Sequence, residues 1–384
     1  MNRPAFALWA TTGFIILLCA PWLLPTNKVY HQLAIGFFWL PSLIALGAVQ
    51  QRAALQSREM LLYVVLSLWT YLVLLIEGGI DPVGKGKVVV YVALSLAGMV
   101  LVERNPRWRL ESILLGSAVL AGVFALMSWV SFYLIDGTAF VTRLVPLGLW
   151  DSIIPAAHAI GAFAVLGFCL LGHRPAALWF KLLACVAVTG FALALSFSQT
   201  RGIWVALAVT LVAMTVIKRS RQGLFVIVAL AVVAAVILVI DPILLLQRGV
   251  SYRPQLWAGG LALMQQHWLL GLGFAEYWLH IPDVADFKHP HNLFLDIGVR
   301  LGVPGLLLFL ALWFAVAWRG LQHRAEPLGV ALLALWIFST VSLMTDGIGL
   351  WLKPNADWMI TWVPVGLSMV LAYRSRRAEA DPNG

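Results

Sequence analysis

Charged residues are scarce in this chain. Only 11% of its 384 residues are Asp, Glu, Lys or Arg, whereas 61% are hydrophobic. Soluble domains carry about twice that share of charge, so this composition excludes an ordinary soluble protein. In place of charge the sequence has apolar runs, such as 6–24, 61–76, 224–240 and 303–318, whose length suits a hydrocarbon core. The runs do not alternate residue by residue, so they predict membrane-spanning helices rather than barrel strands.

Cysteine is rare as well, and all three cysteines, Cys19, Cys169 and Cys185, lie inside apolar runs. There they behave as small hydrophobic residues, which excludes a cysteine-rich metal cluster and makes disulfides unexpected. The sequence also lacks a dividing linker and an internal repeat of the kind found in inverted-repeat transporters. We therefore expect residues 1–384 to form a single transmembrane domain.

Helices are expected wherever an apolar run is long enough to cross the bilayer. The predicted ranges are 6–24, 33–49, 60–76, 88–102, 112–135, 152–171, 177–197, 203–217, 224–240, 292–318 with a break near Gly302 to Pro304, 328–343 and 359–373. The sequence thus predicts an all-α polytopic membrane protein of about twelve transmembrane helices.

The formal charge of +9 is unevenly distributed among the connections. In a soluble protein such a charge would suggest nucleic acid, but here it bears on topology, and no nucleic-acid partner is expected. Alternate connections are short and basic, and hold Arg52, Arg58, Arg104, Arg107, Arg109, Arg174, Lys218, Arg219, Arg221, Arg319 and Arg324. The positive-inside rule makes these connections and both termini cytoplasmic, in a bacterial inner membrane. The opposite connections, which carry Asp81, Asp136, Asp151, Asp241, Asp283, Asp286, Asp346 and Asp357, then face the periplasm.

One of these opposite connections, residues 241–291, is long. Structureless loops of about fifty residues are uncommon, and long loops are usually functional or partly folded. Pro254 to Leu270 has apolar residues at helical spacing, with Trp257 and Trp268 near its ends. This pattern predicts an amphipathic helix at the membrane interface within the long periplasmic loop.

The first candidate site is His289, His291 and Asn292, where this loop re-enters the membrane. The two histidines could bind a metal, but no third ligand stands nearby at a recognisable spacing, so no metal is expected. They could also be interfacial histidines hydrated by water and lipid headgroups. A neutral imidazole is, in addition, the usual general base near pH 7.

Two arginines are the next candidates. Arg201 lies between two apolar runs in the segment SFSQTRG, where the adjacent Gly202 lets another group approach the backbone. Arg253 begins the expected amphipathic helix in the segment YRPQLW. Both could be ordinary interfacial or surface arginines. The functional alternative is that their guanidinium groups bind phosphate oxygens.

Weaker candidates lie in two other outer connections. Lys85 and Lys87 add positive charge to a glycine-rich loop, and Asp346 lies in the last outer connection, for which a solvated turn is the favoured interpretation. Taken together, a histidine and several cations on the outer face suit an anionic lipid-linked substrate. The cations would neutralise a phosphate or diphosphate, and the histidine would accept a proton from a hydroxyl nucleophile.

The span from about Ser196 to Leu308 resembles the core of the O-antigen ligase and O-antigen polymerase superfamily. The strongest part of the match is GLGFAEYWLHIPDVADFKHPHNLFLDIGVRLGVPGLLLFL, which is similar to the family's glycine-rich turn, outer loop, His-x-His-Asn motif and following helix. SFSQTRG and YRPQLW resemble its two arginine motifs. The remaining helices match only in number and hydropathy.

The resemblance implies an inverting, metal-independent glycosyl transfer in the periplasm, from an undecaprenyl-diphosphate-linked glycan to a hydroxyl acceptor, without a cofactor. His291, beside Asn292, takes the place of the family's essential histidine, as the base or as the group that orients the acceptor. Arg201 and Arg253 match the arginines that hold the diphosphate. The resemblance also suggests supporting roles for four further residues, on weaker motif matches: His289, Lys85, Lys87 and Asp346.

Three functions remain open from the sequence. The single long loop and the ending TDGIGLWLKPNADWMITWVP resemble ligases, whose acceptor is the lipid A core, more than polymerases. A non-catalytic transporter of lipid-linked glycans is the third alternative. Transport requires a polar route across the membrane, and the plainest ionisable residues within apolar runs, His158 and Lys181, belong to no evident chain of polar groups.

Overall fold

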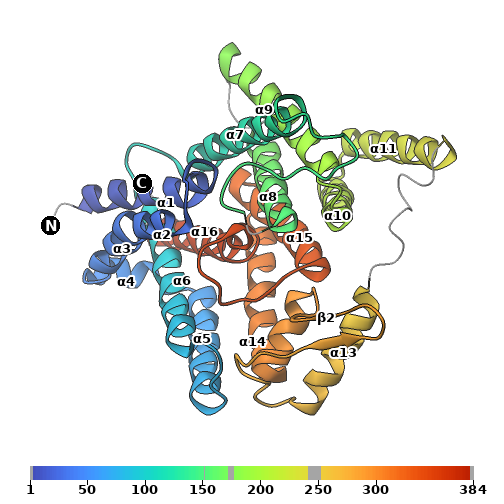
Figure 1. Ribbon diagram of the computed structural model, residues 1–384. Helices are drawn as coiled ribbons and strands as arrows, with labels where there is room; N and C mark the ends of the chain where they lie inside the picture. The colour runs from blue at the N-terminus through green and yellow to red at the C-terminus, as the bar shows by residue number, and fades with distance from the viewer. Residues whose placement is uncertain (1–2, 151, 172–176, 241–251, 381–384) are drawn as a thin grey trace.

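The computed structural model describes residues 3–150, 152–171, 177–240 and 252–380 (Figure 1). Asp151, Arg174, Asp241 and the first part of the long loop, 241–251, lie outside the described residues. The elements are α1 (Arg3–Leu23), α2 (Asn27–Ala34), the π-helix η1 (Ile35–Trp39), α3 (Leu40–Ala45), α4 (Val49–Ala54), α5 (Arg58–Ile76), α6 (Pro82–Val102), α7 (Leu110–Trp129), the π-helix η2 (Val130–Ile135), α8 (Ile153–Leu171), α9 (Leu178–Phe197), α10 (Arg201–Lys218), α11 (Arg221–Ile240), α13 (Arg253–Gln266), β1 (Leu279–Ile281), β2 (Ala285–Phe287), α14 (Leu293–Gln322), α15 (Pro327–Thr345), the 3₁₀-helix η3 (Ala356–Met359) and α16 (Trp362–Ala380).

The predicted all-α polytopic membrane fold is confirmed. Within the described residues, ten helices are long and apolar enough to cross a membrane. The two other predicted helices also have counterparts. One is divided among α2, η1 and α3, and the other is α11. Four connections, α5 to α6, α7 to α8, α9 to α10 and α15 to α16, gather at one end of the bundle, and α14 also begins there. This end is here called the loop face.

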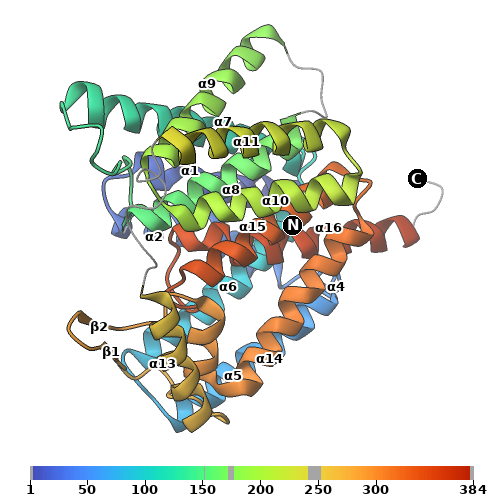
Figure 2. The ribbon, with the colours of Figure 1, turned by 90° about the vertical axis from the view of Figure 1, so that its right-hand side faces the viewer.

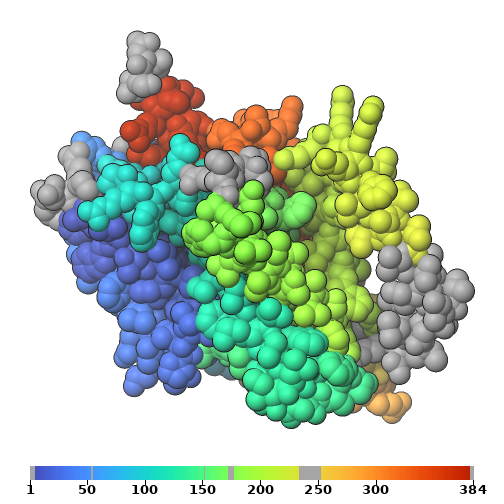
Figure 3. All heavy atoms as spheres, turned by 90° about the horizontal axis from the view of Figure 1, so that it is seen from above, coloured from blue at the N-terminus to red at the C-terminus, as the bar shows by residue number. Residues whose placement is uncertain are grey.

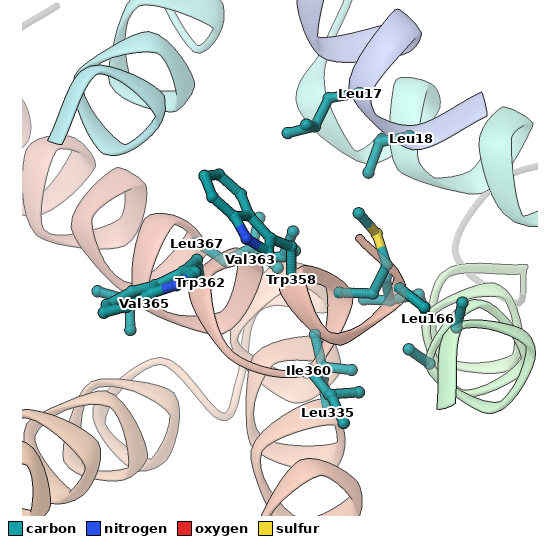
Figure 4. Packing of buried hydrophobic residues seen from close by; sticks show 14 of the residues in the cluster. Leu17, Leu18, Leu166, Leu335, Trp358, Ile360, Trp362, Val363, Val365 and Leu367 are labelled. Atoms are coloured by element: carbon teal, nitrogen blue, oxygen red, sulfur yellow. The ribbon is translucent and has the colours of Figure 1, made fainter. Parts of the chain in front are cut away.

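The centre of the bundle is formed by η3 and α16 (Figure 4). Trp358 and Trp362 are almost fully buried among leucine and valine side chains of several helices. Trp351, from the connection before η3, stacks on Trp362 with ring centroids 5.2 Å apart. This packing fixes the last connection of the loop face, residues 346–361, against the core.

Small residues bring helices into close contact, as expected for a membrane bundle. A Cβ atom on Gly190 of α9 would lie 2.0 Å from the carbonyl oxygen of Gly122 on α7. One on Gly161 of α8 would meet the ring of Phe338 on α15. Side chains of larger size at these two positions would therefore push the helices apart.

The outer helices α10 and α11 carry exposed apolar side chains. Leu224, Phe225 and Leu230 of α11 and Val216 of α10 all have more than half of their surface accessible. Figure 2 shows the two helices crossing one side of the molecule, and in Figure 3 they lie across the bundle from the N-terminal helices. Such a surface fits contact with lipid chains.

The predicted break in α14 is present at Gly302. This residue has a φ of 69°, and a Cβ atom here would collide with the carbonyl oxygen of Leu269. The loop after α13 packs into the break, where the backbone N–H groups of Leu272 and Gly273 donate to the carbonyls of Val299 and Arg300. These bonds satisfy carbonyl groups that the kink removes from the helical ladder.

The long loop contains a helix at the expected place, although its apolar residues are not gathered on one face as predicted, and it contains one unexpected feature. α13 packs one face against α14, with Leu256 and Gly260 buried, so it rests on protein along that face. After it, β1 and β2 form a short antiparallel hairpin that the sequence analysis did not predict. Strands of three residues offer too little alternation to stand out from a loop.

Candidate active site

The predicted base lies at the start of α14, beside the end of α15. Nδ1 of His291 is 2.9 Å from Oδ1 of Asp346, and their side chains are 26% and 10% exposed. Asn292 caps α14 by accepting a hydrogen bond from the backbone N–H of Leu295. His291 itself has a positive φ of 50°, a conformation uncommon for non-glycine residues and often found at functional sites. The helix start thus holds the imidazole against the carboxylate.

The interpretation of Asp346 as a solvated turn is wrong, because the residue is buried and bonded to His291. Burial by itself raises the pKa of this carboxyl, but the hydrogen bond to His291 and the neighbouring charge of His158 outweigh it and lower the pKa. An ionised Asp346 accepts a hydrogen bond from the Nδ1–H group of His291. Nε2 of the neutral imidazole is then the unprotonated nitrogen and can act as a base.

His289 stands next to this pair. Its ring centroid is 4.1 Å from that of His291, and its Nδ1 accepts a hydrogen bond from the backbone N–H of His291. Burial, followed by repulsion from His291, lowers the pKa of His289 to about 4. His289 is therefore neutral near pH 7 and adds no charge to the base beside it.

Arg253 and the residue after Arg201 both contact Thr345, the last residue of α15. Nε of Arg253, at the start of α13, donates to the carbonyl oxygen of Thr345 at 2.5 Å. Gly202, next to Arg201 at the start of α10, is so close to Thr345 that an added Cβ would lie 2.5 Å from its hydroxyl. Three helix starts, two with arginines, therefore surround one end of α15 and favour an anion there.

A further arginine supports this region and was missed by the sequence analysis. Arg143, in the connection between η2 and α8, donates from Nε to the carbonyl oxygen of Ser198 at 2.8 Å. Its other nitrogen donates to the hydroxyl of Thr200 at 3.1 Å. The contacts hold the turn that precedes Arg201, and only the three-dimensional arrangement connects residues so far apart in the sequence.

Of the two lysine candidates, only Lys85 lies near the site. The Nζ atom of Lys85 donates to the carbonyl oxygen of Trp351 at 3.2 Å, five residues beyond Asp346. The side chain of Lys87 is exposed farther along α6. Lys85 therefore belongs to the surroundings of the site, and Lys87 does not reach the contacts described here.

Folding also supplies the third potential metal ligand that the sequence spacing did not reveal. Ligand atoms of His289, His291 and Asp346 lie within 4.8 Å of one another. Two histidines and a carboxylate could fill three positions of a zinc site that leaves one position open. The expectation of a reaction without metal stays a prediction, since the donor set suits either a metal or a hydrogen-bonded base.

A second histidine–aspartate pair lies nearby, and it includes His158, for which no polar partner was evident from the sequence. Its Nδ1 is 2.8 Å from Oδ1 of Asp357 in η3, and the side chains are only 2% and 7% exposed. Nε2 of His158 is buried without a hydrogen-bond partner among the described residues. The pair ties α8 to the connection that also contains Asp346.

Comparison with known proteins bears directly on this region. A family model described as O-antigen ligase matches residues 186–310, a span that contains Arg201, Arg253 and His291. Over 376 residues the chain is also 24% identical to an O-antigen ligase of Pseudomonas aeruginosa, which covers 95% of this chain and 91% of that protein. Both findings support the O-antigen ligase superfamily, as the sequence resemblance predicted.

Proposed function

We propose that this membrane protein is an O-antigen ligase, an inverting, metal-independent glycosyltransferase. It would transfer a glycan from undecaprenyl diphosphate to a hydroxyl group of the lipid A core. The observation that carries the proposal is the His291–Asp346 pair at the end of α15, where Arg253 donates to Thr345 and Gly202, next to Arg201, packs against the same residue. Similarity to proteins described as O-antigen ligases favours ligation over polymerisation.

His291 is the proposed base. Nε2 takes the proton of the acceptor hydroxyl while Asp346, through Nδ1, holds the imidazole in the required tautomer. The acceptor oxygen bonds to the anomeric carbon as the bond between that carbon and the diphosphate oxygen breaks. The bonding electrons leave with undecaprenyl diphosphate, and a single displacement inverts the anomeric centre.

Arg201 and Arg253 are the proposed diphosphate ligands. Charge on the diphosphate grows as the glycosidic bond breaks, so guanidinium groups near it stabilise the transition state more than the ground state. The exposed apolar surface of α10, whose first residue is Arg201, would lie against the undecaprenyl chain.

In this mechanism the arginines supply the positive charge that a metal would otherwise provide, so EDTA treatment is expected to leave the transfer rate unchanged.

The proposed orientation places the loop face in the periplasm and both termini in the cytoplasm of a bacterial inner membrane. Its support is the basic character of the opposite connections. At that opposite end, for example, the connection between α6 and α7 holds Arg104, Arg107 and Arg109. The acceptor and the lipid-linked donor would then meet on the periplasmic side.

The test is a comparison of a strain lacking the gene with the same strain complemented. We expect the deletion to remove long glycan chains from the lipid A core on a lipopolysaccharide gel, while long polymer accumulates on the lipid carrier. Complementation with His291→Ala should not restore the chains. If single repeat units still reach the core in the deletion strain, the protein is a polymerase. Unchanged pools in both strains would refute the proposal.

A further inference from the structure

A cavity of about 310 Å³ opens at the loop face on the side of α14 that faces α6. Its lining includes Lys85, Tyr277, Asp296, Arg300 and Trp351. The volume is at the lower end of the roughly 300 to 1,000 Å³ typical of small-molecule sites. The cavity lining also includes Ile348, two residues after Asp346, the partner of the proposed base.

This cavity lies on the other side of α14 from α13, the helix that begins with Arg253. Figure 1 shows α13, which begins with Arg253, to the right of α14, whereas α6, which carries Lys85, is to the left. His291 immediately precedes Asn292, the N-cap of α14. A donor diphosphate bound to the arginines would therefore leave the cavity open to the other substrate.

Lys85 is the cation in this cavity whose charge is not taken up by an ion pair. Arg300 binds both carboxylate oxygens of Asp296 at 3.1 Å, and Lys288 pairs with Glu276 at 3.3 Å. In the described part of the chain Lys85 forms no salt bridge. Its half-buried ammonium donates to the carbonyl of Trp351 and lies 5.8 Å from the ring centroid of Phe274. An ammonium group carries three donors, so it can still bind an anionic oxygen.

The rest of the lining suits a sugar. Glu276, whose side chain is 53% exposed, supplies carboxylate oxygens that can accept hydrogen bonds from hydroxyl groups, and the largely buried rings of Tyr277 and Trp351 form part of the wall.

A second cavity of about 330 Å³ continues past Lys85 towards His31 and Lys353. Lys85 and Trp351 line both cavities, so the two adjoin along these side chains. Adjoining spaces of this size suit several linked sugar rings better than one. Lys85 stands where a substituent of such a chain would pass from one cavity to the other.

We propose that these two cavities bind the acceptor, as an oligosaccharide bearing a phosphate or carboxylate group, and that Lys85 binds this anionic group. The proposal rests on the proposed function, since it assigns the second substrate of that reaction. The acceptor hydroxyl would approach His291 from the α6 side as the donor lies on the α10 and α13 side. Lys85 then determines acceptor affinity and has no part in binding the diphosphate.

The test uses the full-length protein in lipid nanodiscs, with Lys85→Met, which removes the charge and keeps most of the side chain. Its matched control is Lys87→Met, on the same helix but lining neither cavity. We expect Lys85→Met to raise the KM for lipid A core about tenfold or more, as for loss of one charge-assisted hydrogen bond. The KM for the donor should stay unchanged, and Lys85→Arg should recover much of the acceptor affinity.

Comparing untreated lipid A core with phosphatase-treated core shows whether Lys85 binds a phosphate or a carboxylate group. Treating the lipid A core with phosphatase should abolish the difference between wild type and Lys85→Met if Lys85 binds phosphate, and should preserve it if Lys85 binds a carboxylate. An unchanged acceptor KM in Lys85→Met, or a raised donor KM, would overturn the assignment. Binding of labelled lipid A core alone, by thermophoresis, measures the cavity without the reaction. If wild-type protein transfers no glycan but binds this core through Lys85, the proposed function fails and the cavity assignment stands.

Discussion

The loop face contains two histidine–aspartate pairs of nearly equal geometry and different surroundings. His291 and Asp346 are 2.9 Å apart and partly exposed, whereas His158 and Asp357 are 2.8 Å apart and almost completely buried. The first pair lies next to Thr345, which Arg253 contacts and against which the start of α10 at Arg201 and Gly202 packs, and the second ties α8 to η3. The hydrogen bond alone therefore does not identify a base. Access for a substrate and the presence of cations that stabilise a leaving group separate a proposed catalytic pair from a structural one.

The largest expected effect is on activity. His291→Gln should lower the transfer rate by roughly 10²- to 10⁴-fold, because the amide cannot accept the proton of the acceptor hydroxyl. His158→Gln should retain most of the activity, since an amide N–H can still donate to Asp357. Rates with purified protein and lipid-linked donor measure both. A severe loss in His158→Gln, or full activity in His291→Gln, would reverse the roles of the pairs. If the protein were instead a non-catalytic transporter of lipid-linked glycans, His291→Ala should keep part of its function.

The second effect is on stability. Here the His158 variant should lose more than the His291 variant, which is the reverse of the order expected for activity. His158→Ala leaves the carboxylate of Asp357 buried without its partner, which costs about 3–5 kcal/mol. His291→Ala should cost less, because that side chain is 26% exposed and water can reach the carboxylate it leaves. Thermal unfolding of the two variants in the same detergent gives the comparison. Equal losses would mean that burial does not distinguish the two pairs.

A smaller effect concerns the arginines beside the exposed pair. Arg201→Lys keeps the charge but loses the planar fork that matches phosphate oxygens, so we expect the KM for the donor to rise about tenfold. The KM for the acceptor should not change. Steady-state kinetics with each substrate varied in turn provide the measurement. A donor KM equal to that of wild type would show that Arg201 does not bind the diphosphate in a bidentate manner.

The contrast between the two pairs also shows what sequence can predict here. Apolar runs bounded by basic connections were enough to predict the helices, and Gly302 next to Pro304 was enough to predict the break in α14. These features depend on neighbouring residues and on the bilayer, whose thickness sets the length of each run. His291, Arg201 and Arg253 were identified because each lies in a short motif.

The partners of the histidines could not be found in the same way. Asp346 is 55 residues from His291, and Asp357 is 199 residues from His158. Both aspartates occupy a connection whose path is fixed by the packing of Trp351, Trp358 and Trp362 in the centre of the bundle. A local pattern contains no information about that packing, so Asp346 was interpreted as a solvated turn.

The smallest expected effect tests the neighbour of the exposed pair. Burial, and then repulsion from His291, lowers the pKa of His289 from 6.5 to about 4. Because this folded-state pKa is below the unfolded value, the contribution of His289 to stability is complete above pH 6.5 and is lost as the pH falls towards 4. His289→Gln removes this titration. Between pH 7 and 4.5 the unfolding temperature of wild type should therefore fall by more than that of the variant, measured in one detergent. Parallel curves would mean that His289 titrates at its ordinary pKa, and that it carries a charge beside His291 under mildly acidic conditions.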